Sequence, residues 1–132
     1  MLVPAPVQHQ IAQKAPLVAY APARLAVGWR YSTWSTGEFG ALHIVFTNKA
    51  GRKIEFVAAR FKGNCRAGMT KSFQLDGNKV YWSHTAAEQQ AWRCVVSPNR
   101  ALIRLTATTT VPPTKFSDSG LGQVAAAGHY VR

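Results

Sequence analysis

The stretch that decides the fold of this chain is residues 42–58, LHIVFTNKAGRKIEFVA. Apolar residues alternate with their neighbours on both sides of a central turn and are predicted to face one side: Leu42, Ile44 and Phe46, then Ile54, Phe56 and Ala58. A period of two is typical of a half-buried strand. Gly51 suits the loop between the two runs, because glycine adopts positive φ without steric cost. The stretch therefore predicts an antiparallel hairpin with one apolar face.

The same alternation extends outward from this hairpin. Further strands are predicted over residues 27–34, 72–75, 79–84, 92–96 and 102–110, with turn signals such as Asp76-Gly77 between them. Residues 116–127 are predicted to form a C-terminal helix that ends at Gly128. The predicted fold is mainly β, or α+β through this helix, with an antiparallel sheet of about six to seven strands.

The N-terminal segment differs in composition from the rest of the chain. Four of the seven prolines lie in residues 1–23, at Pro4, Pro6, Pro16 and Pro22. Proline favours extended polyproline conformations. We therefore predict an extended arm over residues 1–23 and a single β-rich domain over residues 24–132. Its apolar side chains lead us to expect that the arm docks on a protein partner or mediates self-assembly.

The chain has two cysteines, Cys65 and Cys94. Two thiols alone do not complete a four-ligand zinc site, so no metal site is predicted. A disulfide would close a loop of about 30 residues and stabilise the domain by roughly 3–4 kcal/mol. This pairing predicts an oxidising, extracytoplasmic compartment. Two buried free thiols in a cytosolic protein are the alternative. Met1–Pro4 has no basic region and no apolar run of a secretory signal, so extracytoplasmic placement requires that a leader was replaced.

Charge points to the class of partner. Sixteen bases oppose five acids, which gives a formal net charge of +11. Such an imbalance favours anionic partners, including nucleic acid, phospholipid headgroups, acidic polymers and acidic protein faces. Seven bases fall within one short stretch and are the candidate contacts for an anionic partner: Lys49, Arg52, Lys53, Arg60, Lys62, Arg66 and Lys71. Interleaved aromatic residues would make this stretch a groove for single-stranded nucleic acid. A solvated strand face is the alternative, and it is the one we favour.

Three aromatic residues are candidate ligand contacts: Trp29, Trp34 and Tyr81. Together with Trp82 and Trp92 they could form a ledge for a sugar, and core packing is the competing interpretation. Tyr81 and Trp82 are adjacent on a predicted strand and are therefore expected to point to opposite faces.

No motif for catalysis, phosphate binding or membrane spanning is found. Ser83 and His84 are adjacent on a predicted strand, so they are expected to point apart rather than to form a nucleophile–base pair. The five acids are scattered, which argues against a paired-carboxylate mechanism. No apolar run reaches the length of about 18 residues that a membrane-spanning helix needs. We therefore predict no enzyme, no cofactor and no transmembrane segment.

Several short motifs occur in a familiar order along residues 22–127. They are Pro22 with Gly28-Trp29, the hairpin Ile44–Phe56, the segment LDGNKVYW at 75–82, Ala91-Trp92-Arg93, Leu102–Leu105 and LGQVA at 121–125. This order resembles that of small extracytoplasmic domains of bacterial envelope proteins, such as those of some anti-sigma factors and lipoproteins. The resemblance implies an antiparallel sheet with a packed terminal helix and a sensing or protein-contact role. It carries over no catalytic residue, and neither the cysteine pair nor the basic charge belongs to it.

The sequence therefore predicts a non-enzymatic, extracytoplasmic binding domain, an envelope or assembly subunit. A basic nucleic-acid-binding module is the alternative.

Overall fold

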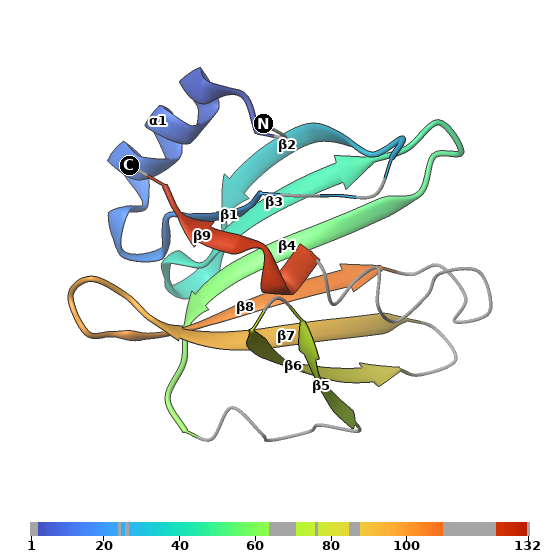
Figure 1. Ribbon diagram of the computed structural model, residues 1–132. Coiled ribbons are helices and arrows are strands. Elements are labelled where there is room, and N and C mark those ends of the chain that lie inside the picture. The colour runs from blue at the N-terminus through green and yellow to red at the C-terminus, as the bar shows by residue number, and fades with distance from the viewer. Residues whose placement is uncertain are drawn as a thin grey trace.

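The predicted hairpin is present and lies within a larger sheet (Figure 1). Strand β3 (Leu42–Thr47) pairs antiparallel with β4 (Lys53–Arg60). In the turn between them, Asn48 Oδ1 accepts hydrogen bonds from the backbone N–H groups of Ala50 and Arg52, and Gly51 has φ +77°. The computed structural model describes residues 3–23, 25, 27–63, 71–75, 77–84, 88–109 and 124–131.

The remaining elements complete a fold that is mainly β, which confirms the predicted fold class. In chain order they are α1 (Ala5–Lys14), the 3-10 turn η1 (Pro16–Val18), β1 (Tyr20–Pro22), β2 (Arg30–Thr36), the 3-10 turn η2 (Glu38–Gly40), β5 (Lys71–Leu75), β6 (Asn78–His84), β7 (Gln89–Val96), β8 (Leu102–Thr109) and β9 (Gly128–Tyr130). The larger sheet has seven strands in the order β2-β3-β4-β8-β7-β6-β5, and β1 pairs with β9 in a second, two-stranded sheet. Every strand pair in both sheets is antiparallel.

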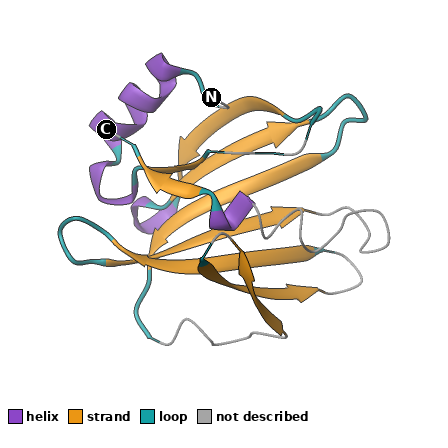
Figure 2. Ribbon diagram, in the orientation of Figure 1, coloured by secondary structure: helices purple, strands orange, loops and turns teal. Residues whose placement is uncertain are grey.

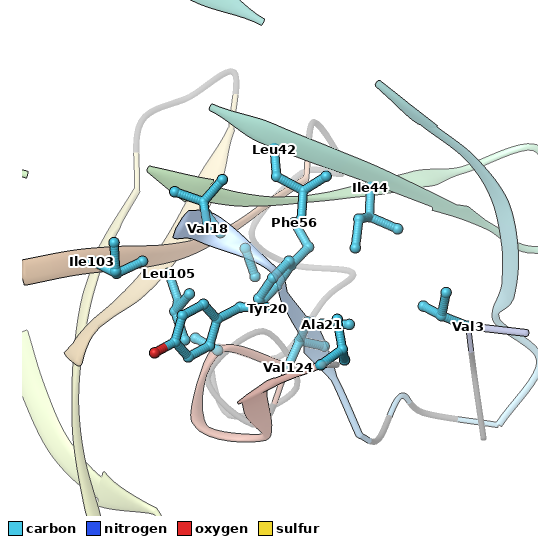
Figure 3. Close-up of a cluster of buried hydrophobic side chains, with 14 of the residues drawn as sticks. Val3, Val18, Tyr20, Ala21, Leu42, Ile44, Phe56, Ile103, Leu105 and Val124 are labelled. Carbon is cyan, nitrogen blue, oxygen red and sulfur yellow. The ribbon is translucent and has the colours of Figure 1, made fainter. Parts of the chain in front are cut away.

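The hydrophobic core lies on one face of the larger sheet (Figure 3). The predicted inward-facing residues of the hairpin are all buried, and β8 adds Ile103, Leu105 and Ala107 in register with β4. On β2 the alternation changes, because the register shifts between Tyr31 and Thr33. A shift of this kind places one extra residue in the strand. Tyr31 and Trp34 therefore lie opposite the core residues Phe46 and Ile44.

A second layer made from both ends of the chain covers this core (Figure 2). α1, η1, β1 and β9 all lie on the core face, and β1 is buried along its whole length. Gly128 at the start of β9 lies so close to the sheet that a Cβ there would be 2.6 Å from a methyl group of Leu105. Tyr130 hydrogen-bonds through its hydroxyl to the Pro16 carbonyl at 2.9 Å and so joins the two ends.

The prediction of an extended N-terminal arm is wrong. The segment contains a ten-residue helix, and Ile11 of that helix is fully buried in the chain's own core. The prolines are compatible with the helix because of where they fall. Pro4 and Pro6 lie at its N-terminus, where backbone N–H groups have no helical partner, and Pro16 follows its end. Residues 3–23 therefore pack against the rest of the domain and do not form an extended arm, and their docking on a partner stays a prediction.

The C-terminal helix is described only in part. Residues 124–126 are helical, and residues 116–123 of the predicted helix lie outside the described residues. Val124 and Ala125 are buried against the sheet. The Ala126 carbonyl accepts hydrogen bonds from the side chains of Arg93 and Asn78. A cation suits this position, because the end of a helical turn exposes carbonyl groups without a backbone partner.

Candidate binding site

One end of the larger sheet brings together segments that are distant in the sequence. The register places Thr36 opposite Leu42, Arg60 opposite Ile103 and Val96 opposite Leu102. The β2–β3 turn, the chain after β4 and the β7–β8 hairpin therefore share this end, on the left of Figure 1. The α1–η1 junction reaches the same end.

Two adjoining hollows lie between these segments. The first has a volume of about 330 Å³ and is lined by residues 14–18 together with Thr36, Phe39, Gly40 and Arg60. The second has a volume of about 630 Å³ and is lined by Phe39, Arg60, Phe61, Lys62, Ala101 and Leu102. Phe39 and Arg60 line both hollows. We call the two hollows together the loop-end groove.

Phe39 stands between the hollows in an unusual conformation. Its backbone has φ +58° and ψ +21°, in the left-handed region, and its side chain is fully exposed. An L-residue pays about 1–2 kcal/mol for this conformation. The burial that usually stabilises an aromatic side chain is missing here. Strain of this kind persists where the surrounding structure imposes it, and it is concentrated at functional sites.

The groove is electropositive. Lys14, Arg60 and Lys62 line it with exposed side chains, and Arg100 lies next to its wall residue Ala101. Glu38 is the one acid in these loops among the described residues. The exposed bases of this end have no acidic partner within the described part of the chain. Bases that outnumber the acids near them attract anions.

A row of stacked side chains supports the wall of the groove from the outer face of the sheet. The guanidinium carbon of Arg104 lies 5.1 Å from the ring centre of Phe61 and 4.6 Å from that of Trp92. Trp92 in turn stacks on Tyr81, with ring centres 6.1 Å apart. Burial lowers the pKa of Arg104. The two aromatic faces offset part of the cost of desolvating its charge. The Arg104 guanidinium therefore contacts both Phe61, in the wall of the groove, and Trp92.

The seven bases that the sequence grouped together do not form one patch. Lys49, Arg52 and Lys53 lie at the β3–β4 turn, whereas Arg60 and Lys62 lie at the other end of β4. β4 is eight residues long. At about 3.3 Å per residue the two groups are therefore about 23 Å apart.

Of the two remaining bases of that cluster, one lies elsewhere on the sheet and the other has no described position. Lys71 begins β5, at the far edge of the sheet from β2. Arg66 lies outside the described residues. The bases are separated because an extended strand is long for its number of residues, so residues that are close in sequence lie far apart in space.

The predicted aromatic ledge is not formed either. Trp29 and Trp34 are half-buried and pack against the core beside β2. Tyr81 is buried on the opposite face of the sheet, where Lys79 lies 5.7 Å from its ring centre. Tyr81 and Trp82 do point to opposite faces, since their partners on β7 are the adjacent residues Trp92 and Ala91.

Cys94 lies on β7, half-buried, and Cys65 lies outside the described residues. Their pairing therefore stays a prediction.

Three of the residues that define the groove were not among the sequence predictions. Phe39, Leu17 and Lys14 were not singled out, because each lies in a short turn or at a helix end and matches no motif. One signal was available. A bulky aromatic between two glycines, in the segment Gly37–Gly40, is unusual for a turn, since turns favour small and polar residues.

Within the described ranges, no cluster of three or more His, Cys, Asp or Glu side chains is placed to hold a metal ion. None of the described helices is long and apolar enough to cross a membrane. Comparisons with protein-family models, with curated proteins and with solved structures found no match. The resemblance to envelope domains therefore stays a prediction.

Proposed function

We propose that this protein is a non-enzymatic binding domain that takes an anionic ligand in the loop-end groove. The observation that carries the proposal is the pair Phe39 and Arg60, which lines both hollows. One is an exposed aromatic held in a strained conformation, and the other is an exposed cation. Together they offer an anionic ligand a charge partner and an apolar contact.

The chemistry of the lining favours binding over catalysis. General acid–base chemistry needs a group that titrates near the working pH, most often an imidazole or a carboxylate. The described lining residues include neither, and no thiol. Ser83 and His84 are consecutive residues of β6, so their positions alternate between the two faces of the sheet.

A nucleic-acid module is the less favoured alternative. Single-stranded nucleic acid is held by a continuous basic groove with successive aromatic stacking platforms. Here the basic residues are divided between two ends of the sheet, and Tyr81 and Trp92 are buried. Phe39 alone offers an exposed ring in the described part of the groove.

We further propose that the domain is extracytoplasmic and that Cys65 and Cys94 form a disulfide. The support is the pair of cysteines, which a disulfide would use in full and which an oxidising compartment would keep paired. Intact-mass measurement tests this pairing, because the unreduced protein would weigh two hydrogens less than the reduced chain. Alkylation of both thiols in native, unreduced protein would contradict it.

Binding of dye-labelled polyglutamate, followed by fluorescence anisotropy, tests the site. The Phe39→Ser/Arg60→Gln double variant should bind more weakly than the parent protein. The matched control is Val27→Ser/Lys53→Gln, which also removes one exposed apolar side chain and one exposed base, but at the opposite end of the sheet. Equal losses in both variants would mean that net charge alone attracts the polymer and that the groove is not the site.

A further inference from the structure

Three of the four exposed large apolar side chains in the described part of the chain lie at the end of the sheet that holds the loop-end groove. The four side chains are Leu17 (42 % exposed), Val27 (104 %), Phe39 (101 %) and Val96 (68 %). Leu17 and Phe39 line the smaller hollow. Val96 ends β7 opposite Leu102, which lines the larger hollow. Val27 precedes β2 and lies at the other end of the sheet.

The three exposed apolar residues at the groove end project from three separate segments. Leu17 lies in η1, Phe39 in η2 and Val96 at the start of the β7–β8 hairpin, all on the left of Figure 2. They lie on separate loops, and bases line the groove beside them: Lys14 and Arg60 in the smaller hollow and Lys62 in the larger. Single apolar side chains on neighbouring loops suit an extended ligand, such as a lipid surface, that several loops contact at once.

Basic residues lie near each of these three exposed apolar side chains. Lys14 is near Leu17 on the wall of the smaller hollow, Arg60 and Lys62 are beside Phe39, and Arg100 is on the same hairpin as Val96. Long basic side chains place their charge at the level of lipid headgroups while their stems follow the apolar surface. Anionic lipid attracts such residues, and apolar side chains add affinity by entering the boundary between headgroups and acyl chains.

We propose that the loop-end groove docks on an anionic lipid surface, with Phe39, Leu17 and Val96 entering the interfacial layer and the surrounding bases contacting headgroups. This inference rests on the proposed function and names the ligand of that site. The left-handed backbone of Phe39 helps, because it holds the ring out of the protein, where it would meet the lipid.

Sedimentation with lipid vesicles tests the proposal. The full chain should bind vesicles of phosphatidylcholine mixed with phosphatidylserine, bind phosphatidylcholine alone far more weakly, and lose affinity as salt is raised, because salt screens exposed charges. Arg60→Gln/Lys62→Gln should lower the partition coefficient about 25-fold, at about fivefold for each base near the surface. Phe39→Ser should lower it about tenfold, and Phe39→Trp should restore it, because tryptophan favours the interface.

Matched controls lie at the opposite end of the sheet. Two variants remove the same kinds of side chain there: Val27→Ser and Lys49→Gln/Lys53→Gln. Each should change the partition coefficient by less than about twofold, since these side chains would not touch the membrane. Losses as large as those in the groove variants would overturn the proposal, since they would show attraction through net charge only.

The same variants separate this inference from the proposed function. If the groove variants lose polyglutamate binding but the parent protein does not bind anionic vesicles, the groove is an anion site and the lipid inference is wrong. If the parent binds a single-stranded oligonucleotide through the groove and not vesicles, the ligand is nucleic acid, and the lipid inference is again wrong. If neither probe depends on Phe39 or Arg60, the proposed function fails as well.

Discussion

Phe39→Asn should make the domain more stable. Phe39 has φ +58° with its ring fully exposed, so the residue bears the steric cost of the left-handed region and loses no packing when it is replaced. That cost is about 1–2 kcal/mol for most L-residues and smaller for asparagine. We expect a gain of about 1 kcal/mol in the free energy of unfolding, which corresponds to a rise in Tm of about 3 °C for a domain of this size.

The assay is thermal unfolding followed by circular dichroism, paired with urea unfolding. Arg100 provides a matched control, because it is also an exposed turn residue with φ +63°. Arg100→Asn should therefore raise Tm by a similar amount. Both substitutions should also weaken anion binding, since Phe39→Asn removes the exposed ring of the groove and Arg100→Asn removes one of the bases beside it. A lower Tm for Phe39→Asn would refute the reasoning, because it would show that the ring makes stabilising contacts in solution.

Three further predictions concern the covering layer. Ile11→Ala should lower the free energy of unfolding by about 2–5 kcal/mol in urea titration, because Ile11 is fully buried and its loss leaves a cavity. An effect near zero would show that α1 is undocked in solution. Gly128→Ala should destabilise by about 1–3 kcal/mol in the same assay, since its Cβ would meet the buried Leu105. Burial raises the pKa of Tyr20, so its neutral form stabilises the fold below the ordinary pKa of 10.0, and this contribution is lost as pH rises through the raised value. Tyr20→Phe should therefore make unfolding less sensitive to pH above about 10, and an unchanged alkaline slope would contradict this.

Local pattern was a reliable guide to the strands and a poor guide to the N-terminus. The alternation around Leu42–Ala58 predicted both the strands and their buried face, because a period of two reports the face directly. The number of prolines in residues 1–23 favours extended backbone, but Pro4, Pro6 and Pro16 lie at the start and after the end of α1, where they are compatible with a helix. A ten-residue helix such as α1 is only marginally stable in isolation. Packing of Ile11 and its neighbours against the sheet stabilises it, and the local sequence does not show that this sheet is there. β1 and β9 were missed for the same reason, since each has three residues and forms only against the other.

The sequence by itself determined the period of the strands, the apolar face of the hairpin and the excess of positive charge. Each of these properties depends on neighbouring residues or on the total composition, so it can be read without knowing which residues are in contact in the folded chain. Only the tertiary structure decided where the positively charged side chains lie relative to one another. The fold placed Arg60 and Lys62 at the same end of the sheet as Lys14, which comes from the N-terminal helix, and separated them from Lys53 by the length of one strand. It also decided that Phe39 is exposed rather than buried, because the geometry of a turn, and not the hydrophobicity of the side chain, controls where that ring points.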